Sequence, residues 1–263
     1  MTAGYIASVL IGISLGLIGG GGSILTIPVL VYLFGVQPLL ATGYSLFIVG
    51  STSLVGAVKN YRKGLVHVET AVYFSITSTI VVLITRKFLL HIIPDHLFAV
   101  NGWLITKSLL TMILFAAVML IAAIKMITGK NPAEDISQTR KHSISKIIIS
   151  ATGIGLLTGL LGAGGGFLII PALIFLFHLP VKEAIGTSLM IIAINSLIGF
   201  TGDIIHTTVN WGLLLPITAF AVAGIFIGSK IGEKMEGDKL KKGFGWFVLV
   251  MGIYILVKEI SIL

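Results

Sequence analysis

Long apolar runs are the feature of this sequence that most restricts its fold. The segments 104–127 and 243–257 carry few charges, and roughly 20 apolar residues in a helix are enough to cross the hydrocarbon core of a bilayer. Charged residues make up 11% of the chain, whereas a soluble domain has about 25%. Too few charges are available to cover a surface in contact with water. The sequence therefore predicts an all-α polytopic protein embedded in the lipid bilayer.

The second half of the chain is a diverged copy of the first. A shift of 143 residues places 16–28 on 159–171. Each of these segments combines a glycine cluster with a downstream proline, Pro28 or Pro171. Internal repeats are common in membrane transporters, where they meet around the substrate site.

The match between the halves extends well beyond the glycine clusters. About 20 of the 45 positions in 12–56 are identical to those in 155–199. We therefore expect two homologous transmembrane repeats, residues 1–127 and 144–263, joined by a cytoplasmic linker, residues 128–143.

Each repeat divides into five apolar pieces. They are 3–18, 23–36, 39–58, 66–85 and 103–127 in the first repeat, and 145–161, 166–179, 183–202, 211–229 and 243–262 in the second. The second piece of each repeat has about 13 apolar residues and would rise about 20 Å as a helix, less than a hydrocarbon core of roughly 30 Å. The first and second pieces are therefore expected to form a broken or re-entrant pair joined at the glycine cluster. This gives about 8–10 membrane helices, with four full crossings per repeat as the alternative.

The Lys and Arg residues of the loops predict the orientation of the repeats. Lys59, Arg62 and Lys63 follow the third piece of the first repeat, whereas the corresponding loop, 203–210, has neither Lys nor Arg. The basic loop of the second repeat is instead the next one, 230–242. Because Lys and Arg mark cytoplasmic loops, the two repeats are expected to be inverted relative to each other. Four crossings per repeat would make them parallel.

The first repeat also contains an insertion near 86–102. Its Pro94, Asp95 and Asn101 interrupt the apolar pattern, since proline and short polar residues favour turns over helix. The insertion is therefore predicted to be an interfacial segment.

The glycine clusters interrupt the apolar pieces at equivalent places. Each glycine costs a helix roughly 1 kcal/mol relative to alanine, and non-helical backbone at membrane depth is tolerated where it is buried in protein or lines a wet cavity. Accessible N–H groups and the positive N-terminal end of the next helix favour a bound anion. Close helix packing is the alternative role. The predicted substrate-binding glycines are Gly19, Gly20, Gly21, Gly22, Gly162, Gly164, Gly165 and Gly166.

Hydroxyl and amide side chains near the repeated motifs form a second set of candidates. Hydroxyls in membrane helices also bond the carbonyl of the preceding turn, so a local role is the alternative for each of them. The predicted substrate-binding side chains are Ser23, Thr26, Ser45, Thr187, Ser188 and Asn195. Asp203 follows an apolar run of 20 residues and either carries a coupling proton or marks the end of a helix.

Composition excludes several other kinds of site. The chain has no cysteine, which excludes disulfides and thiolate metal ligands, and no two of its six histidines have metal-ligand spacing. The formal charge of +8 lies in short loops, as in the positive-inside pattern of membrane proteins. We therefore expect no cofactor, no metal site and no nucleic-acid partner.

The paired motifs resemble those of the sulfite exporter TauE/SafE family. The resemblance rests on the glycine-rich segments that end in Pro28 and Pro171, each followed by Gly-Xaa-Ser, at 43–45 or 186–188, and it covers nearly the whole chain. It implies a multi-pass carrier in the cytoplasmic membrane of a bacterium or archaeon. The implied substrate is a small sulfur-containing anion, such as sulfite or an organosulfonate, and the implied direction is export.

Two other classes of protein compete with a carrier. A passive anion channel would conduct many ions per opening, whereas a carrier saturates and exchanges its substrate. An intramembrane hydrolase is suggested by Ser14, which lies in a GxSxG pattern, but the equivalent residue of the second repeat is Leu157. The expected function is secondary transport by alternating access, driven by the membrane potential or a coupling proton, and not an enzymatic reaction.

Overall fold

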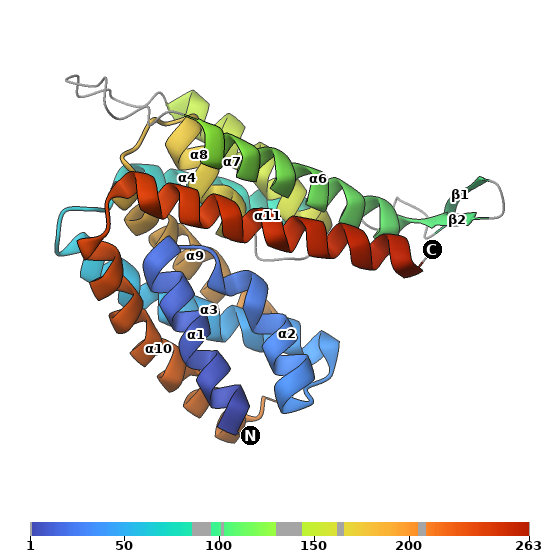
Figure 1. Cartoon of the computed structure of the whole chain (residues 1–263), viewed down its shortest axis with the longest axis horizontal. Helices are drawn as coiled ribbons and strands as arrows, with labels where there is room; N and C mark the ends of the chain where they lie inside the picture. The colour runs from blue at the N-terminus through green and yellow to red at the C-terminus, as the bar shows by residue number, and fades with distance from the viewer. Residues whose placement is uncertain are drawn as a thin grey trace.

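The computed structural model describes residues 2–85, 96–100, 103–129, 144–161, 166–204 and 209–262. Within these residues the chain forms ten helices and one small β-hairpin (Figure 1). The helices are α1 (Thr2–Ile18), α2 (Gly22–Phe34), α3 (Pro38–Tyr61), α4 (Val68–Ile84), α6 (Lys107–Thr128), α7 (Ile144–Leu161), α8 (Gly166–Phe175), α9 (Val181–Ile204), α10 (Trp211–Lys234) and α11 (Gly237–Ile262). The predicted all-α class is confirmed.

Several of the described helices are long and apolar enough to cross a membrane. These four segments are Leu40–Tyr61 in α3, Val181–Thr201 in α9, Trp211–Lys234 in α10 and Gly237–Val257 in α11. Large apolar side chains also point outward from the shorter helices, as at Ile6, 65% exposed, and Ile149, 71% exposed. A surface of this kind is unfavourable in water and suits contact with acyl chains.

Helices α1 and α2 form an antiparallel hairpin whose tip is the first glycine cluster. Gly4 of α1 packs against the ring of Phe34 at the far end of α2, and Gly22 of α2 packs against Ile11 and Leu15. With 17 and 13 residues, the two helices rise only about 26 Å and 20 Å. Both are shorter than a hydrocarbon core of roughly 30 Å, and they are joined at the glycine cluster as the sequence predicted. A re-entrant path through the membrane stays a prediction.

The main helix pairs join the two halves of the chain. Helix α1 packs on α10, α3 on α9, α4 on α7, and α6 on α11, as Figure 1 shows for α6, which runs alongside α11. Helices α3 and α9 are antiparallel, because Gly56 lies against Leu189 whereas Gly199 lies against Leu46. A continuous buried cluster of leucine, isoleucine, phenylalanine and methionine side chains from both halves fills the space between them. The core is therefore shared between the halves.

The start of the fifth apolar piece differs from the sequence-based expectation. Strands β1 (His96–Val100) and β2 (Trp103–Thr106) form an antiparallel hairpin, and α6 begins only at Lys107. The predicted start of a helical piece at residue 103 is therefore wrong. Aromatic and β-branched residues favour strands but are as apolar as a membrane helix, so hydropathy could not separate the two. The rest of the insertion, 86–95 and 101–102, lies outside the described residues.

Candidate functional site

The glycine-rich segment between α1 and α2 forms a tight turn inside the protein. Gly19 is buried and has a φ of 74°, a left-handed conformation that favours glycine, and its N–H donates to the Leu15 carbonyl at 2.7 Å. A Cβ on Gly19 would lie 2.7 Å from the Ser188 Oγ of α9. This turn requires glycine both for its backbone angle and for its close approach to α9.

The two glycine-rich motifs meet at this turn. A Cβ on Gly20 would lie 2.5 Å from the carbonyl oxygen of Gly166, the first residue of α8. A Cβ on Gly166 would in turn lie 3.2 Å from the Ser23 Oγ of α2. Backbone therefore approaches backbone where the N-terminal ends of α2 and α8 come together. We call this place the glycine junction, which comprises residues 19–23, Gly166 and Ser188.

The predicted hydroxyls at or beside the junction bond to nearby backbone. Ser23 Oγ donates to the carbonyl three residues earlier at 2.7 Å, and Thr26 Oγ1 to the carbonyl four residues earlier at 2.8 Å. Ser188 Oγ donates to the carbonyl three residues earlier at 2.8 Å and lies 3.4 Å from the Gly19 carbonyl. Because a hydroxyl proton rotates to suit its acceptor, an oxyanion in the junction would compete with these carbonyls.

The structure describes only some of the remaining predicted site residues. Gly162, Gly164 and Gly165 lie outside the described residues, so Gly166 alone represents the second cluster. Asp203 lies in the last turn of α9, and its side chain is also outside the described set. Ser45 is buried on α3. The choice between a coupling role and a helix-end role for Asp203 stays a prediction.

Two predicted residues of α9 form hydrogen bonds to the first half of the chain. The Thr187 hydroxyl accepts the backbone N–H of His67 at 3.0 Å. The Asn195 amide donates to Ser78 Oγ at 2.9 Å and accepts from Thr79 Oγ1 at 2.9 Å. These hydrogen bonds hold α9 against α4 and the residue before it, and they give both side chains a structural partner.

The structure adds a candidate that the sequence pointed to for a different reason. Ser14 Oγ is buried and has no hydrogen-bond partner among the described residues, and a Cβ on Gly21 would lie 2.7 Å from it. A buried polar group without a partner costs about 1–3 kcal/mol. Such a group beside the glycine junction is available to bind a polar ligand. The only sequence signal for it was the GxSxG pattern.

The two glycines that flank Ser14 serve helix packing. A Cβ on Gly12 would clash with the Ala221 carbonyl, and one on Gly16 would lie 2.5 Å from the Ile225 carbonyl. Gly224 and Gly228 of α10 face α1 in the same close way. Small residues let membrane helices approach until backbones touch. Helix α1 is therefore held firmly on α10 while its C-terminal end presents the junction.

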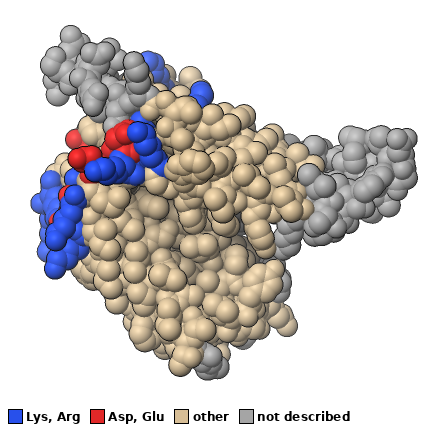
Figure 2. Space-filling view, in the orientation of Figure 1, with Lys and Arg blue, Asp and Glu red and all other residues tan. Residues whose placement is uncertain are grey.

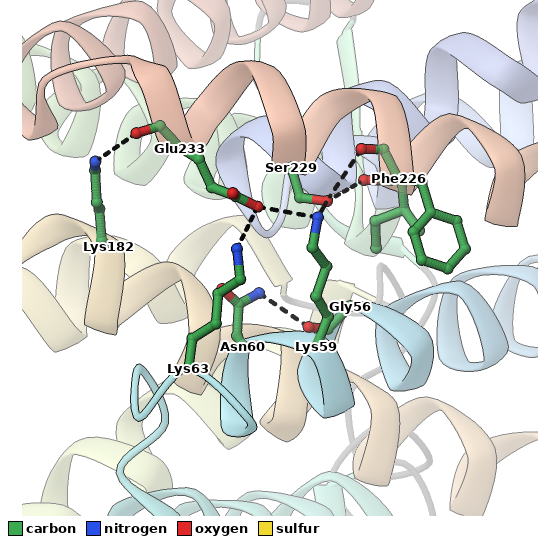
Figure 3. A network of polar contacts seen from close by, with 9 residues as sticks. Gly56, Lys59, Asn60, Lys63, Lys182, Phe226, Ser229 and Glu233 are labelled. Atoms are coloured by element: carbon green, nitrogen blue, oxygen red, sulfur yellow. Dashed lines mark hydrogen bonds and ion pairs between the residues drawn. The ribbon is translucent and has the colours of Figure 1, made fainter.

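Basic residues gather at one end of the molecule, away from the N-terminus (Figures 1 and 2). Lys59 and Lys63, at the end of α3, contact the Glu233 carboxylate at the end of α10 at 3.0 and 2.6 Å (Figure 3). Lys59 also donates to Ser229 Oγ at 3.0 Å, and Lys182 donates to the Glu233 carbonyl at 3.0 Å. The basic loops that sequence analysis assigned to the same side of the membrane thus lie together.

The Sulfite exporter TauE/SafE family matches this chain over residues 5–255. The chain belongs to that family. A probable membrane transporter protein of Xylella fastidiosa is 31% identical over 252 residues, covering 94% of this chain and 91% of the relative. The probable membrane transporter protein YunE of Bacillus subtilis is 28% identical, with 84% of each chain covered. The probable membrane transporter protein MJ0441 of Methanocaldococcus jannaschii is 36% identical over 114 residues, 41% of this chain and 43% of the relative.

Membership of the TauE/SafE family fixes the general activity. The relatives are named as membrane transporters rather than enzymes, so this chain is a multi-pass membrane transporter and the predicted class is confirmed. These relatives come from bacteria and an archaeon, which agrees with a cytoplasmic membrane location. None of the relatives' names specifies a substrate or a direction of transport.

Proposed function

We propose that this TauE/SafE family member is a secondary transporter that exports a small sulfur-containing oxyanion, such as sulfite or an organosulfonate. The observation that carries the proposal is the meeting of Gly20 with Gly166, which joins two equivalent glycine-rich motifs inside a membrane-embedded fold. The name of the family suggests the class of substrate. The glycine junction would form its binding site.

The chemistry of the junction suits an anion. Helix α2 begins at Gly22 and α8 at Gly166, and the first turn of a helix leaves N–H groups without intrahelical partners. The helix dipole adds a partial charge of about +0.5 at each such end. Ser14 Oγ and Ser23 Oγ are further donors beside these ends. A site of this kind would need no lysine or arginine at membrane depth, where a charged side chain is costly.

The proposed mechanism is alternating access between inverted repeats, residues 1–127 and 144–263. A shift of 143 residues places Gly56 on Gly199 and Leu46 on Leu189. The contact of Gly56 with Leu189 and the contact of Gly199 with Leu46 are therefore equivalent in the two repeats. The helices that carry these contacts, α3 and α9, run in opposite directions. The symmetry that places the first repeat on the second therefore places α3 on a helix that runs in the opposite direction across the membrane, as inverted repeats require. Rocking of one repeat against the other would open the junction to each side in turn.

The membrane potential can drive the proposed export. An anion that leaves a cell with a negative interior gains about 2.3 kcal/mol per charge per 100 mV. No coupling ion is needed for that direction. A coupling proton would need a titratable carrier in the membrane region, and Asp203 of α9 is the candidate for that role.

Flux into proteoliposomes tests the proposal. Purified protein would be assayed with sulfite, thiosulfate, sulfate, sulfoacetate and chloride, and compared with Gly20→Ala. A methyl group at Gly20 would press on the Gly166 carbonyl, so we expect substrate flux to fall strongly. The matched control is Gly153→Ala in α7, where nothing lies within 4 Å of an added Cβ. This control should retain wild-type flux.

The dependence of the flux on substrate concentration, and on substrate at the opposite side of the membrane, distinguishes a carrier from a channel. Saturable flux of one sulfur oxyanion that is accelerated by substrate on the opposite side supports the carrier. Non-saturating conductance of several anions, including chloride, would make the protein a channel instead. Absence of flux for every sulfur oxyanion, or equal flux through wild type and Gly20→Ala, would contradict the proposed site.

A further inference from the structure

An apolar groove lies on the outer surface between α3 and α10. Its volume is about 580 Å³, and its walls are Leu54, Val55 and Val58 of α3 and Phe226 of α10. Leu54, Val58 and Phe226 are 42%, 41% and 50% exposed, so the groove opens outward, toward the bilayer, and not into the protein. It is separate from the glycine junction, none of whose residues line it.

The groove ends in three cations. Lys59, Arg62 and Lys63 line the same cavity as the apolar walls. Glu233 pairs with both lysines, so the end of the groove keeps a net positive charge. Arg62 is exposed and forms no ion pair with any residue of the described part of the chain. With no such partner among the described residues, its guanidinium group can take an oxyanion in a two-pronged hydrogen bond.

The walls and the charged end fit the two parts of one amphiphilic molecule. From Leu54 in α3 to Arg62, which caps the end of α3 in helical conformation, the chain rises about 12 Å, which matches the upper part of an acyl chain with its headgroup. Lys59 also lies 6.0 Å from the centre of the Phe226 ring, which joins the apolar wall to the charged end. A small hydrophilic anion would leave the apolar walls unused. A basic pocket between membrane helices on the cytoplasmic side is suited to an anionic lipid headgroup.

We infer that this groove binds an anionic phospholipid of the cytoplasmic leaflet. The phosphate would lie against Arg62 and Lys63, and one acyl chain would lie along Val58, Leu54 and Phe226. The inference goes beyond the proposed transport of a sulfur oxyanion and does not depend on it. Its readout is lipid binding, which can be measured without any substrate.

Native mass spectrometry of the purified protein in detergent tests the inference. The probes are dioleoyl-phosphatidylglycerol and dioleoyl-phosphatidylcholine, which share their acyl chains and differ in headgroup charge, with inorganic phosphate as a competitor. We expect preferential binding of phosphatidylglycerol that excess phosphate does not displace. Arg62→Gln should weaken that binding about fivefold, the effect of one basic residue near an anionic lipid.

Two further variants separate the groove from general surface charge. Lys239→Gln removes the same charge from an exposed residue of α11 that does not line the groove, and it should bind phosphatidylglycerol like wild type. Val58→Gln leaves every charge in place and should weaken binding by disrupting the apolar wall. Equal binding of both lipids, equal effects of Arg62→Gln and Lys239→Gln, or displacement by free phosphate would overturn the inference. Unchanged binding in Val58→Gln would also overturn it.

Discussion

The backbone N–H of His67 donates a 3.0 Å hydrogen bond to the hydroxyl of Thr187. The same relationship recurs between the N–H of Asn210 and the hydroxyl of Tyr44, at 2.7 Å. A shift of 143 residues places His67 on Asn210 and Tyr44 on Thr187, so the two hydrogen bonds occupy equivalent positions. His67 and Asn210 directly precede α4 and α10. In each half, the start of one helix is therefore tied to a long helix of the other half, α9 or α3.

Replacement of Thr187 should weaken this tie. Thr187→Val keeps the shape of the side chain but removes the acceptor for the His67 N–H, so we expect the free energy of unfolding to fall by about 0.5–1.5 kcal/mol. Thermal unfolding in detergent would measure the change. Thr201→Val on the same helix is the control, because Thr201 is exposed and bonds only its own helix. A stability loss no larger than that of the control would show that the tie contributes nothing.

A buried lysine should contribute more to stability than its exposed neighbour. Lys241 is 0% exposed, and its Nζ donates to the Gly129 carbonyl at the end of α6 at 2.7 Å. Lys241→Met removes a charged donor from the negative end of a helix, which should cost about 1.5–3 kcal/mol. Lys242→Met removes only a half-exposed ion pair with Asp238 and should cost about 1 kcal/mol or less. Equal unfolding temperatures for the two variants would argue against this account of Lys241.

The orientation of the repeats can be read by labelling single cysteines. The chain contains no cysteine, so Lys63→Cys, in the loop between α3 and α4, and Asn210→Cys, directly before α10, would each carry one thiol. Inversion predicts that a membrane-impermeant maleimide reaches Asn210→Cys from outside intact cells and Lys63→Cys only after the cells are opened. Labelling of both from the same side would indicate parallel repeats.

The helices could be predicted closely because long apolar runs and their polar interruptions are local properties. Helix α9, expected over 183–202, spans Val181–Ile204, and α7, expected over 145–161, spans Ile144–Leu161. The hairpin that includes Trp103 was missed because strand-forming residues in a short apolar run resemble a helix in hydropathy. The repeat stays a prediction from the sequence, since its evidence is residue identity at a fixed offset.

The partners of polar side chains could not be predicted in the same way. Thr187 and Asn195, whose place at the substrate site stays a prediction, bond to His67, Ser78 and Thr79, residues more than 100 positions away. Such pairs depend on how α4 and α9 pack, which no local pattern encodes. Ser14 could be noticed in its GxSxG pattern, but its missing hydrogen bond is a property of the folded structure alone.

Replacement of Ser14 by alanine tests most directly whether the glycine junction binds the substrate. Ser14 Oγ has no partner among the described residues, so Ser14→Ala should leave the unfolding temperature unchanged or slightly higher. The hydroxyl would bond only the transported anion, and loss of a hydrogen bond to a charged group costs about 1.5–3 kcal/mol. Proteoliposome flux of the sulfur oxyanion should therefore show a half-saturation concentration raised about tenfold or more. A fully stable Ser14→Ala protein with wild-type flux kinetics would contradict a substrate site at the junction.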